Sequence, residues 1–355
     1  GARAVKPAWN PDDTEGNHQK LRLDEALKKS MDAYVVNRSG RKTVMAGYPW
    51  FLDWGRDTLI CLRGLLAAGK SNECAEIIRL FASYEENGTI PNMICGEDIS
   101  NRETSDAPLL LILAVREYIR RSKDKGILEI DCNGRTLLDV MKSIVDNYCA
   151  GTPNGIRMCR ESALIYSPSH FTWMDTNYPA CTPREGYPVE IQAMWIASLN
   201  FLAEVGKVNE FAALARRAEK SLVKYYVSTK FVGLSDCLHC KGFKPADNAI
   251  ADDHCRPNQL FAITLNVISD KSLCRHILQA CQGLVIPGAL RTLCDQPVHY
   301  ALPLQKDGRN LNDPLHPYWG HYEGDEDTRR KPSYHNGTAW PWLLPSYCEA
   351  LVVTY

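Results

Sequence analysis

The chain has 355 residues, of which 45% are hydrophobic and 23% charged, a balance that permits a large core and excludes a disordered chain. Its 41 basic and 42 acidic side chains leave a net charge of −1, so nucleic acid and anionic membrane surfaces are not expected as partners. A neutral, polyhydroxylated partner suits this balance better. The sequence has no run of about 18 uncharged apolar residues and no apolar secretion-signal core. These features predict a soluble, cytoplasmic protein.

Fourteen cysteines are an unusually large number for such a protein. They fall at predicted helix-core positions such as Cys61, Cys74, Cys281 and Cys348, and their spacing is not that of a compact disulfide framework. We therefore expect reduced, buried thiols.

Apolar residues recur at helical spacing along most of the chain, and each stripe predicts a core-facing helix. A break at 150–187 contains one predicted hairpin near 155–166, and the two helices after it are expected to pack antiparallel. Pairs of helices joined by long aromatic and charged loops favour a closed ring of helical hairpins, with the site in the loops at one end. The fold class is all-α, in one domain over 1–355. The nine or ten predicted helices lie near 23–34, 59–66, 74–81, 110–114, 137–148, 191–202, 211–225, 256–268, 271–283 and 340–354.

The first loop that concentrates chemistry is YPWFLDWGRDT at 48–58. Trp50 and Trp54 flank Asp53, and Arg56 and Asp57 follow just before a helix. Aromatic faces stack on sugar rings, while Asp and Arg side chains form charge-assisted hydrogen bonds with hydroxyl groups. All five are therefore candidates for sugar binding. The structural alternative makes Asp57 a helix N-cap and Arg56 its surface partner.

The second loop is HFTWMDT at 170–176, followed by TPREGYPVE at 182–190. Asp175 lies between aromatic and apolar neighbours, which raise a carboxyl pKa and favour a protonated general acid. Trp173, Arg184, Glu185 and Glu190 are expected to supply a stacking surface and binding partners around it. The alternative is an Asp with a purely structural role in a loop.

The third loop contains WGHYEGD at 319–325 and YHNGTAWPW at 334–342, again ending at a helix. His335 and Trp340 are candidates for the wall of a sugar subsite. Alternatively, Trp340 and Trp342 are core aromatics at the start of that helix.

A possible metal motif needs separate consideration. Cys237 and Cys240 form a C-x-x-C pair that encloses His239, and His254 and Cys255 follow. The first spacing suits zinc, but the second pair is adjacent and the chain is rich in cysteine throughout, which favours buried thiols. No metal site is assigned. Phosphate-loop and dinucleotide signatures are absent, so no cofactor is expected.

Four strings together resemble a known family. FLDWGRDT, TWMDT with TPREGYPVEIQAMW, RPNQLFA and YHNGTAWPW, in this order, are similar to the signatures of the glucosidase domain of glycogen debranching enzymes, over residues 20–355. The resemblance implies an (α/α)6 barrel that removes single α-1,6-linked glucose residues from glycogen or another branched α-glucan, with inversion. It also implies that Asp175 is the general acid and that Arg56 and Asp57 hold the terminal glucose. Asp106, in ETSDAPL, matches a further family aspartate less closely.

The general base is the point at which the sequence departs from this pattern. An inverting glycosidase needs a second carboxylate about 6.5–9.5 Å from the acid. The resemblance places it in a loop after YHNGTAWPW and before a final helix, whereas this sequence ends at Tyr355. The expectation is a truncated domain in which Glu323 and Glu185 are the only substitutes. A non-catalytic glucan-binding module and an inverting α-glucosidase of another linkage stay open as alternatives.

Overall fold

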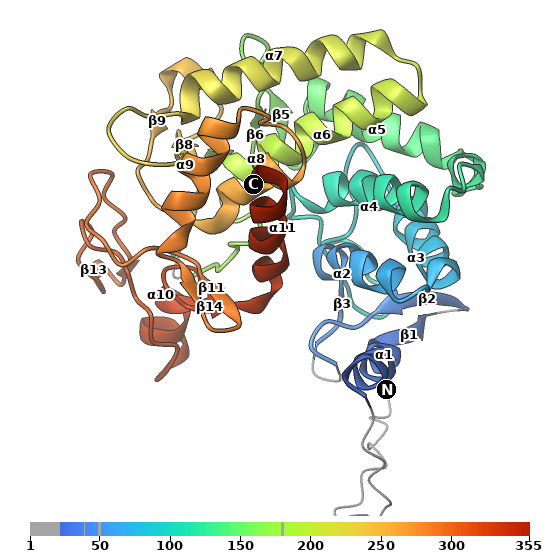
Figure 1. The fold of residues 1–355 in the computed structure, drawn as a ribbon, viewed down its shortest axis with the longest axis horizontal. Coiled ribbons are helices and arrows are strands. Elements are labelled where there is room, and N and C mark those ends of the chain that lie inside the picture. The colour runs from blue at the N-terminus through green and yellow to red at the C-terminus, as the bar shows by residue number, and fades with distance from the viewer. Residues whose placement is uncertain (1–21, 39, 49–50, 179–180) are drawn as a thin grey trace, which may run out of the picture.

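The computed structural model describes residues 22–38, 40–48, 51–178 and 181–355, and the fold over these residues is mostly helical, as predicted (Figure 1). None of the helices in these ranges is both long and apolar enough to cross a bilayer. The helices are α1 Leu23–Tyr34, α2 Gly55–Ala67, α3 Ser71–Ser83, α4 Ala107–Ser122, α5 Leu137–Ala150, α6 Val189–Val205, α7 Asn209–Tyr226, α8 Leu260–Thr264, α9 Lys271–Gln282, α10 Lys331–Tyr334 and α11 Leu344–Thr354.

The long helices form two layers. Helices α2, α4, α6, α8 and α11 contact one another in series, and α3, α5, α7 and α9 pack outside them. The inner helix α6 is buried on nearly every side, whereas the outer helix α7 buries a single stripe, as an amphipathic surface helix does. Residues 206–208 join these two helices, which run antiparallel as the sequence predicts (Figure 1).

The strands are more numerous than the single hairpin predicted. That hairpin is present, with Arg157 opposite Tyr166 in β5 Arg157–Met158 and β6 Ile165–Tyr166. The other strands have only two to four residues, too few for an alternating pattern to stand out in sequence. Three further two-stranded sheets pair β1 Val35–Arg38 with β2 Arg41–Val44, β3 Asp53–Trp54 with β4 Met93–Ile94, and β12 Gln305–Lys306 with β13 Arg309–Asn310. Two three-stranded sheets have the orders β7 Gly186–Pro188, β8 Cys237–His239, β9 Ile250–Ala251 and β10 Val285–Ile286, β11 Ala289–Arg291, β14 Ala339–Trp340.

The motif-bearing loops all lead into the N-terminal ends of the inner helices. Strand β3 precedes α2, Asp106 is the N-cap of α4, and β7 runs directly into α6. The short 3₁₀ turns Pro257–Gln259 and Pro341–Leu343 precede α8 and α11 in the same way. Segments far apart in sequence thereby reach one end of the helical layer.

Two predictions about the core are wrong. Helix α1 forms but buries none of its residues, and Leu23 is 76% exposed, because an apolar stripe shows that a helix is amphipathic without supplying a partner. Cys74 and Cys281 are buried as expected, whereas Cys61 and Cys348 are exposed. The part of the chain that the structure describes contains no disulfide bond.

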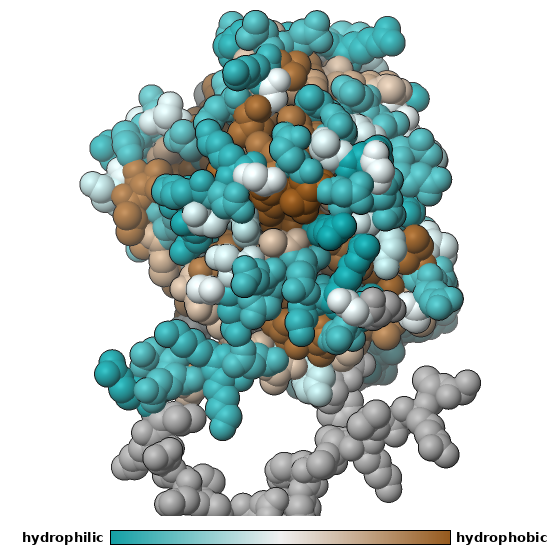
Figure 2. All heavy atoms as spheres, turned by 90° about the vertical axis from the view of Figure 1, so that its right-hand side faces the viewer, coloured by the Kyte–Doolittle hydropathy of each residue, from teal (hydrophilic) through white to brown (hydrophobic). Residues whose placement is uncertain are grey.

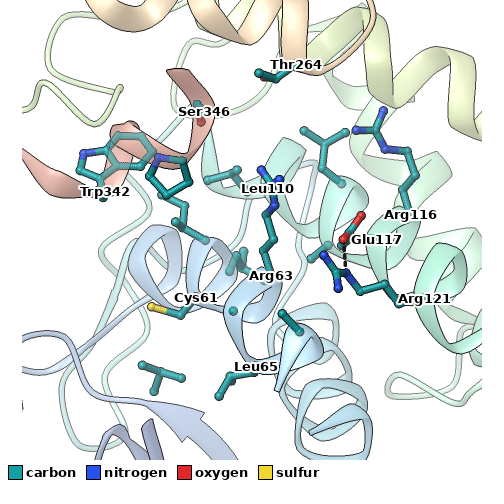
Figure 3. Close-up of a pocket in the computed structure, with 18 of the residues that line it drawn as sticks. Cys61, Arg63, Leu65, Leu110, Arg116, Glu117, Arg121, Thr264, Trp342 and Ser346 are labelled. Carbon is teal, nitrogen blue, oxygen red and sulfur yellow. Dashed lines mark hydrogen bonds and ion pairs between the residues drawn. The ribbon is translucent and has the colours of Figure 1, made fainter. Parts of the chain in front are cut away.

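A pocket of about 630 Å³ opens between α1, α2, α4, α8 and α11 (Figure 3). Its wall is mostly apolar but carries charged groups, including Arg63, which pairs with Glu349 at 2.8 Å. It follows α2 from Leu59 onward, beyond the first turn of that helix. Figure 2 shows another side of the molecule, where apolar side chains reach the surface between hydrophilic ones.

Candidate active site

Arg56 joins three distant segments at the N-terminal ends of the inner helices. It lies in the first turn of α2 and is only 6% exposed. Its Nε donates to Asp106 Oδ2 at 2.7 Å, and its Nη1 donates to Asp175 Oδ2 at 2.8 Å. Its buried Nη2 has no hydrogen-bond partner among the described residues. A buried donor without a partner is costly, so this atom has an unmet demand for an acceptor oxygen, from water or from a ligand.

Asp175 presents its carboxylate from buried surroundings. Its side chain is 31% exposed, and its Oδ1 lies 3.8 Å from Nε2 of the buried His335. The His335 ring makes an edge contact with Trp173 and a stacked contact with Trp340, at centroid distances of 5.2 and 6.4 Å. These aromatic groups fix the imidazole beside the carboxylate.

The charges around Asp175 contradict the expected direction of its pKa. Burial raises this pKa, but the Arg56 guanidinium and then His335 lower it by more, so it lies below the usual value. Burial would lower the pKa of Arg56, yet Asp106 and Asp175 together raise it. Burial lowers the pKa of His335 despite Asp175, which leaves its imidazole mostly neutral at pH 7. Asp175 is therefore held as a carboxylate here.

Asp57 is next to Arg56 and open to solvent. Trp54, and not Asp57, is the N-cap of α2, and Arg56 is buried, so the structural alternative considered for this pair is wrong. Although the residue reaches solvent, its carboxyl group is crowded by protein, and this desolvation, reinforced by Asp175 and opposed by Arg56, raises the pKa of Asp57 above its usual value. Burial, a neighbouring tyrosine, Asp175 and Asp57 together raise the pKa of Tyr334 to about 12. Asp57, Tyr334 and Asp175 thus influence one another electrostatically.

Asp53 has its hydrogen-bonding capacity filled by the protein. It is 2% exposed, accepts 2.5 Å bonds from Nε and Nη2 of Arg38, and lies 3.3 Å from the Thr43 hydroxyl. This carboxylate ties β3 to β1 and β2, so its predicted contact with sugar is replaced by a structural role. Trp54 is half-buried, and Trp50 lies outside the described residues.

Arg184 and Glu190, both predicted to bind substrate, belong instead to a buried ion network. Arg184 donates to the two oxygens of Glu190 at 2.5 and 2.6 Å and to Asp236 at 2.6 Å, and none of the three is more than 3% exposed. Glu185 accepts a 2.7 Å bond from the Tyr166 hydroxyl. The charges of Arg184 and Glu190 are thus compensated within the chain, whereas Glu185 is half-buried and its contact with sugar stays a prediction.

The chain matches a known family over nearly all of its length. A family model described as amylo-alpha-1,6-glucosidase covers residues 29–355. The chain belongs to this family. The match spans the motif loops and all the helices from α2 onward, and membership supports a glycoside hydrolase.

Individual relatives are distant. The chain is 22% identical to a glycogen debranching enzyme of Saccharomyces cerevisiae over 84% of its own length, and it spans about a quarter (24%) of that protein. Among solved structures, a rhamnosidase from Klebsiella oxytoca with rhamnose bound is similar, with a TM-score of 0.46 and 13% identity, over 64% of this chain and 41% of that one.

The string RPNQ contributes supporting hydrogen bonds that the sequence analysis did not assign. Asn258 donates to Asp236 at 2.8 Å and accepts a 2.7 Å bond from the Trp173 indole. Arg256 donates to the backbone carbonyl of His335. Trp173, predicted as a stacking surface, is thus pinned and only 8% exposed, and it backs His335. The sequence did contain a signal for this role, because Arg256 and Asn258 are polar residues at the start of an otherwise apolar helix.

Part of the third loop packs into the core, and part is exposed. Trp340 lies in β14, is half-buried, and donates through Nε1 to the Tyr334 carbonyl at 3.0 Å. Trp342 packs edge-on against Trp173 at a centroid distance of 5.0 Å, which agrees with the core alternative for that residue. Glu323 is exposed in the 319–325 loop.

Proposed function

We propose that this domain is an (α/α)6 barrel that hydrolyses single α-1,6-linked glucose residues of glycogen or another branched α-glucan, with inversion. One observation carries the proposal: Arg56 holds Asp175 beside Asp106 and keeps a buried Nη2 without a partner in the described chain, while Asp57 lies next to it. Guanidinium and carboxylate groups in one place suit a polyhydroxylated ring. Family membership and the similarity to a glycogen debranching enzyme support the choice of substrate.

Asp175 is the general acid in this proposal, although Arg56 lowers its pKa. Oδ2 can accept the Arg56 bond whether the carboxyl group is ionised or not, so the proton can sit on Oδ1. A glucan that covers the exposed part of this side chain removes water from it, and desolvation raises a carboxyl pKa. Bound substrate would thereby favour the protonated form of Asp175, which donates its proton to the departing oxygen.

Arg56 and Asp57 bind hydroxyl groups of the glucose being released. The unpartnered Nη2 of Arg56 is a donor, and the Asp57 carboxylate is an acceptor on the same helical turn. Together they can hold vicinal hydroxyls, which accept from one group and donate to the other.

The test compares two substrates with Asp175→Asn in the full-length protein. A branched dextrin has a poor leaving group that needs a proton, whereas α-glucosyl fluoride releases fluoride without one. We expect glucose release from dextrin to fall by about 10²- to 10⁴-fold, the usual contribution of general acid catalysis, and fluoride release to stay within a few-fold of wild type. Asp295→Asn, a partly exposed aspartate paired with His316, is the matched control.

Each alternative has its own outcome in this experiment. Equal losses on both substrates would assign Asp175 to sugar binding, and full activity on dextrin would remove it from the site. Wild-type protein that binds branched dextrin but cleaves neither substrate would be the glucan-binding module. Release of glucose only from dextrins without α-1,6 branches would identify another linkage.

A further inference from the structure

A second cluster of ligand-type side chains lies beside the Arg184 ion network, because Asp252 accepts a hydrogen bond from the backbone N–H of Asp236. His239 ends β8, and Asp252 and His254 follow β9. Oδ2 of Asp252 lies 2.9 Å from His239 Nε2 and 3.3 Å from His254 Nδ1. Asp252 is fully buried, His254 is 2% exposed, and His239 is 12% exposed. The cluster keeps the two histidines of the motif noted in the sequence, and Asp252 takes the place of its cysteines.

The cysteine thiols of that motif form contacts outside this cluster. Cys237 donates to the Arg184 carbonyl at 3.5 Å, and Cys255 donates to the Ala280 carbonyl at 3.2 Å and lies 3.4 Å from Cys294. The C-x-x-C and H-C pairs therefore do not form one sulfur-rich site.

Hydrogen bonds around the cluster fix which atoms face its centre. His254 Nε2 lies 2.8 Å from the Tyr300 carbonyl oxygen, which can only accept, so this nitrogen carries hydrogen. In the neutral ring Nδ1 then has a lone pair, and it faces the Asp252 carboxylate. Oδ1 of Asp252 accepts from the backbone N–H groups of Asp236 and Cys237, which leaves Oδ2 for the cluster. A lone pair and a carboxylate oxygen repel each other, and a cation between them, either a proton or a metal ion, removes the repulsion; the three ligand atoms lie within 4.8 Å of one another, which leaves the geometry for a metal ion.

The spacing suits a small tetrahedral metal ion. Zinc binds imidazole nitrogen and carboxylate oxygen at about 2.0–2.2 Å, so its tetrahedral ligands lie roughly 3.3 Å apart. The two distances to Oδ2, 2.9 and 3.3 Å, are close to this separation. A calcium ion would instead require about six to eight oxygen ligands. Metal-binding histidines usually donate their second N–H to a carbonyl or carboxylate, as His254 does to Tyr300.

We propose that His239, Asp252 and His254 bind a Zn²⁺ ion, with water in the fourth position on the partly exposed side of His239. The ion would fasten the β8–β9 hairpin to residues 252–254. Because Asp252 also holds the backbone of Asp236, the ion would stiffen the wall that anchors Arg184 and Asn258. This is a structural role, and it does not depend on the proposed hydrolysis.

The experiment titrates zinc into full-length protein that has been reduced and stripped with a chelator, in competition with a chromophoric chelator. The variants are His239→Phe, which keeps an aromatic ring to stack on Tyr300, and His254→Asn, which keeps a donor for the Tyr300 carbonyl. We expect one tight zinc equivalent in wild type and a loss of about 100-fold or more in affinity in each variant, because even outer partners contribute roughly 10- to 100-fold.

Two controls separate this site from the cysteines and from surface histidines. His299→Asn changes an exposed histidine paired with Asp253, and it should keep the equivalent. The double variant Cys237→Ser, Cys255→Ser should keep it too, and the cobalt-loaded protein should lack a thiolate charge-transfer band. Absence of tight binding in wild type, its survival in His239→Phe and His254→Asn, or its loss in the serine variant would overturn the proposal.

Discussion

Replacing Arg184 by methionine distinguishes a supporting role of the TPREG segment from contact with sugar. Arg184 binds both oxygens of Glu190, whose side chain is fully buried, and also binds Asp236, which is 2% exposed. Removing one partner from a buried ion pair costs about 3–5 kcal/mol, because the remaining charge is uncompensated. Asp236 keeps its bond from Asn258, so most of the cost should fall on Glu190.

The pH dependence of this loss follows from Glu190. Burial already raises its pKa against the opposing effect of Arg184, and without Arg184 the pKa of the folded state rises further. Above the unfolded pKa of about 4.3, folded Glu190 then binds more protons than the unfolded chain, so the stability of the variant falls as pH rises. The deficit relative to wild type should be smaller near about pH 5.5 than near about pH 7.5.

Urea unfolding followed by tryptophan fluorescence measures this deficit, with the midpoint and slope fitted together. Arg120→Met is the matched control, because Arg120 is 62% exposed in its pair with Glu117 and should cost less than about 1 kcal/mol. Arg184→Met combined with Glu190→Gln should recover part of the loss. If Arg184→Met costs under about 1 kcal/mol while KM for dextrin rises strongly, Arg184 contacts sugar and the network argument fails.

Three further predictions concern the site. Asn258→Ala removes the bond to Trp173 and should cost about 1–3 kcal/mol while lowering kcat more than it changes KM; an altered KM alone would place Asn258 in substrate binding. Asp57→Ala should weaken inhibition by a glucose-like iminosugar at least about tenfold, and unchanged inhibition with earlier melting would reduce Asp57 to a helix-stabilising residue. Asp106→Asn leaves Arg56 with one anionic partner, so the pKa of Asp175 should fall further and the alkaline limb of kcat/KM should move to lower pH. An alkaline limb that stays in place, or moves to higher pH, would contradict that coupling.

The sequence predicted most of the long helices because their signal is local. A stripe with helical spacing marks the inner and outer helices alike, and only the structure shows that α6 is buried on nearly every side while amphipathic α7 buries one face. The small sheets were missed because pairs such as β11 with β14 are brought together by the fold and not by a turn. Exposure of α1 was missed for a related reason: periodicity identifies an apolar face but not what covers it.

The motif residues were found, but their roles were assigned too uniformly. Arg56 and Asp175 do meet, as loops at one end of the helices predicted. Charged residues in a motif were read as sugar contacts, whereas Arg184 and Asp53 find partners within the chain at 2.5–2.6 Å. The partners in such a network lie on different segments of the chain. The sequence therefore shows that charged residues are present but not which of them pair.

Asp175 shows most clearly what a local reading cannot supply. Its sequence neighbours are aromatic and apolar, and such surroundings alone raise a carboxyl pKa. The group that reverses the sign is Arg56, 119 residues earlier, held in place by α2 and shared with Asp106. If Asp175 is the general acid, its carboxyl group must take up a proton, and a full ion pair with Arg56 would oppose this. Arg56 must therefore do more than supply a positive charge. Its second carboxylate partner, and the Nη2 that has no partner among the described residues, offer a solution, since Asp106 and a bound sugar would both draw the guanidinium away from Asp175. Substrate binding and protonation of the acid would then be one coupled event.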